Sequence, residues 1–121
     1  VALNTNGGVI TNFTNASQGI VRALAVGQSN LFVGGDFIGF TNLGSNYSRT
    51  GLVALNLTSG IIYTNFTANC QSNTAAGGVT NVNALAISGT RLYVGGGFTN
   101  IAGFNRRGLA MLNPNSFVKQ Y

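Results

Sequence analysis

The 121-residue sequence contains no histidine and no tryptophan, one cysteine, one proline and a single acidic residue, Asp36. General acid–base catalysis usually relies on histidine or on paired carboxylates with separated pKa values. Glycosidases use two carboxylates, and a serine or cysteine nucleophile needs a base beside it. Zinc and calcium sites need several cysteine, histidine or acidic ligands. The composition therefore predicts no catalytic residue, no cofactor and no metal site, and it argues against an enzyme.

Charge of either sign is scarce, since charged residues make up 6% of the chain and leave a formal net charge of +5. Among the basic residues only Arg106 and Arg107 are neighbours. Nucleic-acid sites cluster lysine and arginine, often between aromatic residues, so no nucleic-acid partner is expected. Arg49 and Arg106 occupy equivalent places in the repeat described below. They are expected to donate hydrogen bonds to loop carbonyls or to the end of a neighbouring strand, and the positive charge also favours an anionic polysaccharide as a partner.

Long apolar runs are also missing, although 45% of the residues are hydrophobic. No run approaches the about 18 apolar residues of a membrane-spanning helix, so no membrane insertion is expected. The apolar fraction is normal for a folded chain, and the length suits one domain of modest size. The sequence begins inside a strand-like segment, which suggests a processed product or a piece of a longer chain.

The single cysteine, Cys70, lies in a polar stretch. One thiol cannot crosslink the chain to itself, so Cys70 is expected to be an unpaired loop residue or to form an intermolecular disulfide. Sequons of the form N-x-S/T supply candidate N-glycosylation sites, which favours a secreted, extracellular or cell-surface protein. Their asparagines are Asn12, Asn15, Asn46, Asn56 and Asn65.

Blocks of sequence recur in the same order along the chain and indicate an internal repeat. The matched pairs are 21–26 with 82–87, 30–37 with 91–98, 49–56 with 106–113, 1–4 with 53–56, and 10–14 with 63–67. The spacing between partners drifts between roughly 52 and 61 residues, which is within reach of propeller repeats that carry loop insertions.

Each block has the character of a short strand, because alternating or β-branched and aromatic residues are bounded by turn residues. No window keeps a helical period, so helix should be nearly absent. The expected strands are 1–4, 8–13, 21–26, 31–36, 52–56, 61–66, 82–87, 92–97, 109–113 and 116–120. The sequence therefore predicts an all-β fold of tandem four-stranded antiparallel units, like propeller blades, with about two and a half units and open ends. Residues 1–20 form a partial unit of two strands, residues 21–81 form one complete unit, and residues 82–121 form a second.

Two glycine pairs, Gly34-Gly35 and Gly95-Gly96, end equivalent strands. They are expected to be structural, because glycine there lets another backbone approach closely or supplies the positive φ of a bulge. A phosphate-binding loop is the alternative, but it requires a following helix, and none is expected. Asp36 comes directly after the first pair and is expected to cap a turn.

Two stretches carry a resemblance to known repeats: VNALAISGTRLYVGG at 82–96 and LYVGGGFTNIAGFNRRGLAMLN at 92–113. They resemble the delta-60 type propeller repeats of large bacterial surface and secreted proteins, and they are similar to kelch-like repeats of fungal cell-surface proteins. The resemblance covers about Val21 to Asn113 and implies a β-propeller scaffold or adhesin without a defined active site. This chain departs from the bacterial pattern at 56–60 and 113–116, where the usual turn aspartates are replaced.

The leading functional hypothesis is a non-catalytic extracellular structural scaffold that self-associates into a filament or a surface layer. Open strand edges and a surface poor in charge favour pairing with other copies of the chain. The alternatives are a carbohydrate-binding propeller module, in which asparagine and aromatic side chains would hold the sugar, and a fragment of a larger adhesin.

Overall fold

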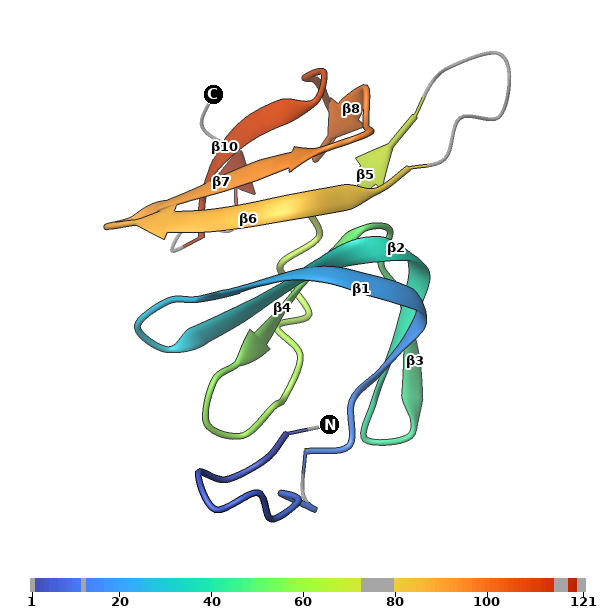
Figure 1. The fold of residues 1–121 in the computed structure, drawn as a ribbon. Coiled ribbons are helices and arrows are strands. Elements are labelled where there is room, and N and C mark those ends of the chain that lie inside the picture. Colours follow the sequence, from blue (N-terminus) through green and yellow to red (C-terminus); the bar gives the residue numbers. More distant parts are fainter. Residues whose placement is uncertain (1, 12, 73–79, 115–117, 120–121) are drawn as a thin grey trace.

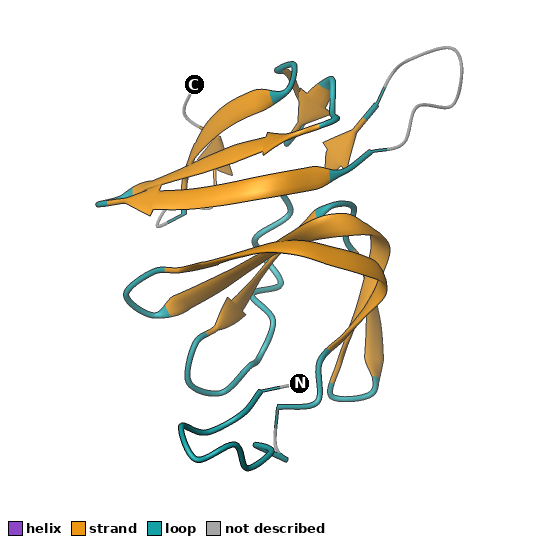
Figure 2. Ribbon diagram, viewed as in Figure 1, coloured by secondary structure: helices purple, strands orange, loops and turns teal. Residues whose placement is uncertain are grey.

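The computed structural model describes residues 2–11, 13–72, 80–114 and 118–119 (Figure 1). These residues form strands, turns and loops without a helix, which confirms the all-β prediction (Figure 2). The strands build three antiparallel sheets, and the described residues show no closed or propeller arrangement. Within the same ranges, no helix is long and apolar enough to cross a membrane.

The first sheet is built on one long strand, β2 (Asn30–Asn42), which changes partners along its length. Its first half pairs with β4 (Leu52–Asn56) and its second half pairs with β3 (Ser45–Ser48). The other edge of β2 pairs with β1 (Ala16–Val26). The register of β1 against β2 shifts at two points, and such bulges increase the bend and twist of the strands.

The second sheet contains four strands that follow one another across the sheet in chain order. They are β6 (Val82–Ser88), β7 (Arg91–Gly96), β10 (Leu109–Asn113) and β11 (Val118–Lys119). A small third sheet joins β5 (Cys70–Gln71), β8 (Asn100–Ile101) and β9 (Phe104–Asn105). Figure 1 shows the second sheet stacked over the first, with the residues before β1 on the far side of the first sheet.

Each repeat unit has a β-hairpin after its glycine pair. In the first unit the hairpin joins β2 to β3 through Leu43 and Gly44, whose φ angles are 51° and 79°. In the second unit it joins β8 to β9 through Ala102 and Gly103, with φ angles of 52° and 79°. Two successive positive φ angles are characteristic of a type I′ hairpin turn. The turns are therefore equivalent although the sequences around them differ.

Equivalent backbone hydrogen bonds join the residues before and after each hairpin. In the first unit Gly35 N–H donates to the Gly51 carbonyl and Gly51 N–H donates to the Phe37 carbonyl. In the second unit Gly96 N–H donates to the Gly108 carbonyl and Gly108 N–H donates to the Phe98 carbonyl. All four distances are 2.9 to 3.0 Å. From Phe37 to Leu43 the first hairpin arm is two residues longer than the arm from Phe98 to Ala102. This difference in hairpin length explains part of the drifting repeat spacing.

The main hydrophobic core lies between the first and second sheets. The first unit contributes Phe32, Leu52, Ala54 and Phe66, while the second contributes Val82, Leu92, Val94, Phe98, Ala110 and Leu112. The rings of Phe32 and Phe66 pack with centroids 5.6 Å apart. A smaller core on the opposite face of the first sheet contains Val33, Phe37, Phe40, Val53, Leu55 and Ile62. The first sheet therefore has a hydrophobic cluster on each face.

The predicted strand positions are confirmed unevenly. β4 and β10 have the expected bounds, whereas β1 and β2 are longer than expected and the hairpin strands were not predicted. The prediction of a strand at 61–66 is wrong, because only Ile62 forms a bridge and the chain turns where the Phe66 N–H bonds to the Tyr63 carbonyl. Residues 1–4 and 8–13 show a single bridge from Leu3 to Val9 among their described members. Of the strand expected at 116–120, residues 116, 117 and 120 lie outside the described residues.

Candidate functional site

The faces of the two large sheets are the largest candidate interaction surfaces. Successive strand residues point to opposite faces, so the pairing registers sort each sheet into two sets of side chains. One set, called here the alanine face, consists of Ala23, Ala25, Phe32, Gly34, Leu52 and Ala54 in the first sheet and of Ala84, Ala86, Tyr93, Gly95, Leu109 and Met111 in the second. The other set, the leucine face, consists of Leu24, Val26, Leu31, Val33, Val53 and Leu55 in the first sheet and of Leu85, Ile87, Leu92, Val94, Ala110 and Leu112 in the second. Repeat-equivalent residues fall on equivalent faces.

Inside the molecule, the alanine face of the first sheet packs against the leucine face of the second. Phe32 on the alanine face is fully buried beside Leu92 and Val94 of the opposing face. At Gly34 the approach is so close that a Cβ would overlap the Val82 side chain and crowd Leu85. The glycine therefore provides a depression that receives side chains of β6.

The alanine face of the second sheet has no covering layer among the described residues. Tyr93, the counterpart of the buried Phe32, is 36% exposed, and Leu109, the counterpart of the buried Leu52, is 66% exposed. At Gly95 the nearest atoms to an added Cβ would lie 3.8 Å away, in Ala84 of β6 and in the carbonyl of Gly108 just before β10. The depression that is filled at Gly34 is therefore open at Gly95.

The leucine face of the first sheet is covered only in part. Val33, Val53 and Leu55 on β2 and β4 are buried, Leu31 is half-buried, and Phe13 packs there from the segment before β1. On β1 the face is open, since Leu24 is 60% exposed and Val26 is 61% exposed. A groove of about 700 Å³ runs between β1 and the N-terminal segment, and its lining includes Leu3, Ile10, Phe13, Val21, Leu24 and Leu31.

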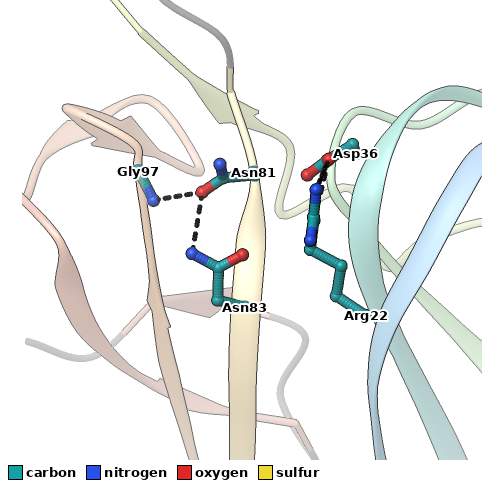
Figure 3. Close-up of polar contacts among 5 residues, drawn as sticks. All are labelled: Arg22, Asp36, Asn81, Asn83 and Gly97. Atoms are coloured by element: carbon teal, nitrogen blue, oxygen red, sulfur yellow. Dashed lines mark hydrogen bonds and ion pairs between the residues drawn. The ribbon is translucent and has the colours of Figure 1, made fainter.

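A polar cluster lies at the bulge of each large sheet (Figure 3). In the first sheet the extra residue of β1 is Arg22, whose Nε and Nη2 donate to Oδ2 of Asp36 at 2.8 and 2.5 Å. The hydrogen bond from Arg22 lowers the pKa of Asp36 and raises that of Arg22, and the charge attraction acts in the same direction. Asp36 lies within β2, so the prediction that it caps a turn is wrong. Its carboxylate instead balances the cation that the bulge presents.

The equivalent bulge of the second sheet has no charge. Its extra residue is Asn83, whose amide donates to Oδ1 of Asn81 at 3.2 Å, and the same oxygen accepts the Gly97 N–H at 2.6 Å. In the aligned repeats Arg22 matches Asn83 and Asp36 matches Gly97, so both charges change together. That paired difference is the sequence feature that could have identified the ion pair.

The second glycine of each pair lies against the backbone of the neighbouring strand. A Cβ at Gly35 would overlap the carbonyl oxygen of Ile20, and a Cβ at Gly96 would overlap that of Asn81. Close approach of the neighbouring strand thus requires glycine at the second position of each pair. None of the four pair glycines has a positive φ.

The arginines that follow the hairpins donate to backbone carbonyls, and the bond of Arg49 to the loop carbonyl of Thr64 confirms the expectation for Arg49. Arg49 donates to the carbonyls of Ser48 and Thr64 at 2.9 Å each, and Arg106 donates to the carbonyl of Asn105 at 2.7 Å. Burial lowers the pKa of Arg49. Arg49 therefore ties the loop at Thr64 to the hairpin, whereas Arg106 bonds only to the residue before it.

The sequon asparagines have different environments. Asn12 lies outside the described residues. Asn46 and Asn65 are exposed, whereas Asn15 and Asn56 are half-buried and their amide nitrogens donate to protein oxygens at 2.9 and 3.1 Å. Of the four sequon asparagines that the structure describes, Asn46 and Asn65 are exposed enough to accept a glycan.

Cys70 lies in strand β5 and is fully buried, so the expectation of a loop residue is wrong. It pairs with Ile101 as Ser17 pairs with the equivalent Phe40, which places a thiol where the first unit has a hydroxyl. Burial raises the pKa of Cys70 to about 12. A disulfide with another chain would therefore require β5 to open.

The described residues contain no group of three or more histidine, cysteine, aspartate or glutamate side chains that could hold a metal ion. Comparison of the chain with protein-family models, with curated proteins and with solved structures gave no significant match.

Proposed function

We propose that the chain is a non-catalytic structural module whose repeat units stack through apolar sheet faces and which associates with copies of itself outside the cell. The observation that carries this proposal is the open alanine face of the second sheet, whose counterpart in the first sheet is buried. Stacked repeats bury a continuous core, and a soluble end repeat normally has a polar outer face. Here the outer face is apolar instead.

The charge distribution supports the same proposal. None of the twelve residues named for each face is charged, and in the described part of the second sheet Arg91, at the first position of β7, borders the alanine face. The single acidic residue, Asp36, is held by Arg22, so its carboxylate serves as a structural partner. Exposed apolar patches of this kind mark interaction surfaces more often than scattered single side chains do.

Sedimentation of the purified chain over a wide concentration range tests the proposal. We expect the average mass to rise with protein concentration, and to rise further in sulfate, because that salt strengthens apolar burial and screens the repulsion between copies of charge +5. A strictly monomeric chain at millimolar concentration, with or without sulfate, would refute self-association.

The bulge cluster favours a second candidate function, the binding of carbohydrate. Oδ1 of Asp36 is buried without a hydrogen-bond partner among the described residues, so a sugar hydroxyl could reach it only if the bulge opened. The amides of Asn81 and Asn83 lie at the equivalent bulge of the second sheet. Carboxylate and amide groups are suitable partners for sugar hydroxyls. We expect Asp36→Asn to weaken any glycan retained on an array, with Asn46→Gln as a control on the hairpin. An array without hits for the folded chain would remove this candidate.

A further inference from the structure

The contact between the two sheets shows how one unit of this repeat fits onto the next. β6 lies against β1 and β2, and its Val82 and Leu85 side chains fill the depression at Gly34. Ile87, further along the same strand, packs on the edge of the main core. The small alanine side chains and the bare glycine backbone of one face thus receive the larger aliphatic side chains of the other.

Both halves of this contact occur again, uncovered, at opposite ends of the chain. The alanine face of the second sheet offers the open depression at Gly95. On β1 the repeat-equivalents of Val82, Leu85 and Ile87 are Val21, Leu24 and Val26, which are 43%, 60% and 61% exposed. The segment before β1 therefore leaves these three side chains accessible.

From this we infer that copies of the chain associate head to tail, and the inference rests on the proposed self-association. The alanine face of the second sheet of one copy packs on β1 of the next copy. Val21 and Leu24 of the second copy occupy the depression at Gly95 as Val82 and Leu85 occupy the one at Gly34. The contact between copies thus repeats the contact between units, and each copy keeps one free face of each kind for further growth.

A symmetric contact between two alanine faces is less suited to these shapes. It would place small side chains such as Ala84 and Ala86 opposite the same small side chains and leave the depression at Gly95 unfilled. Gaps between apolar surfaces forfeit the close contacts that stabilise packing. The internal contact of this chain pairs unlike faces, so the geometry points to unlike faces between copies as well.

Two charge substitutions, one on each face, test the inference. Leu24→Glu disables the β1 side, and Ala86→Glu disables the alanine face of the second sheet. Both residues are exposed, so each variant is expected to keep the thermal unfolding of the parent chain. Each variant alone should be monomeric where the parent chain assembles, with its association constant reduced at least tenfold. An equimolar mixture should form a 1:1 complex and stop there, because only one pair of intact unlike faces remains.

Two further variants test whether the effect comes from the faces themselves: a charge control placed elsewhere and an uncharged substitution in the depression. Leu43→Glu introduces the same charge at the exposed hairpin turn, away from both faces, and should assemble like the parent chain. Gly95→Ala adds a Cβ at the ordinary distance of 3.8 Å from its own surroundings, so it should fold; the equivalent Cβ at Gly34 would overlap Val82, so the variant should associate at least tenfold more weakly.

The outcomes separate the alternatives. If Leu24→Glu still dimerises while Ala86→Glu does not, alanine faces pair with each other and the inference is wrong; the reverse result would mean that leucine faces pair. Continued assembly of both variants would place the contact at strand edges, which overturns the inference but leaves the proposed function standing. A parent chain that remains monomeric would refute both.

Discussion

Alanine substitutions at the two members of one glycine pair are expected to change stability in opposite directions. At Gly96 a Cβ would overlap the Asn81 carbonyl oxygen and crowd the Val82 Cα, and backbone atoms cannot swing aside. At Gly95 an added Cβ would meet Ala84 and the Gly108 carbonyl at 3.8 Å, an ordinary contact distance. Neither glycine has a positive φ, so backbone conformation does not forbid alanine at either position.

The size of each effect follows from these surroundings. Alanine at Gly96 would force β6 and β7 apart and strain the 3.0 Å hydrogen bonds from Gly96 to Gly108 and from Gly97 to Asn81. Overpacking costs about 1–3 kcal/mol and a weakened hydrogen bond about 1 kcal/mol, so a loss of about 2–4 kcal/mol is expected. Alanine at Gly95 should stabilise the fold by about 0.4–1 kcal/mol, because it restricts the unfolded chain.

Urea unfolding followed by circular dichroism measures both changes. The protein concentration must be low enough to keep all variants monomeric, since association would add to the apparent stability. The reasoning is refuted if Gly95→Ala destabilises the protein as much as Gly96→Ala does. In that case crowding by the opposing strand is not what requires glycine at the second position.

Three further outcomes are expected. Phe32→Ala should lower the free energy of unfolding by about 3–5 kcal/mol because the ring is fully buried, whereas Phe104→Ala at the exposed hairpin should change it by less than about 1 kcal/mol; equal losses in denaturant titrations would contradict the assigned core. The Cys70 thiol, with a pKa of about 12, should react with a thiol reagent at pH 8 only after unfolding, and rapid labelling of the native chain would disagree with its burial. Since Arg22 lowers the pKa of Asp36 in the folded state, the stability gained over Asp36→Asn should be fully present above the unfolded value of about 4 and lost as the pH falls through the lower folded value. Denaturant titrations from pH 7 to pH 2 check this, and an undiminished difference at the acid end would exclude the ion pair as its source.

The sequence predicted best the strands whose apolar pattern occurs in both repeat units. β4 and β10 were placed correctly because each is an apolar block of the same kind bounded by turn residues. The second half of β2 was missed, since glycine, threonine and asparagine there give no alternating apolar pattern. That segment is a strand because β1 and β3 pair with it, which is a tertiary effect that local propensity does not contain.

The opposite error occurred at 61–66, where aromatic and β-branched residues resemble a strand. The side chain of Asn56 accepts the N–H groups of Thr58 and Ser59, which starts a tight loop, and the chain turns again at Tyr63. Side-chain hydrogen bonds of this kind compete with strand pairing. Pairing with β4 is limited to the single bridge at Ile62, made by the hydrogen bonds of Ile61 and Tyr63 to β4, so the hydrophobic pattern there indicates burial and does not produce a strand.

The candidate surfaces were accessible to sequence reasoning only in part. Alternation together with the repeat assigns Phe32 and Tyr93 to equivalent faces, but it does not say which face another sheet covers. That distinction needs the stacking order of the sheets. The pair Arg22 and Asp36 was similarly hidden, because the bulge that brings the two side chains together depends on the register between β1 and β2.

The unequal hairpins have a practical consequence for engineering. Strand residues alternate between the two faces of a sheet. Adding two residues to each arm of a hairpin therefore keeps the same side chains pointing inward, whereas adding one residue turns the following side chains to the opposite face. The two units differ by such a step between Phe37 and Leu43, and the closing bonds at Gly51 and Gly108 are the same. The tips at Gly44 and Gly103 are therefore suited to grafting peptides of chosen length, and a display site there would leave both stacking surfaces free.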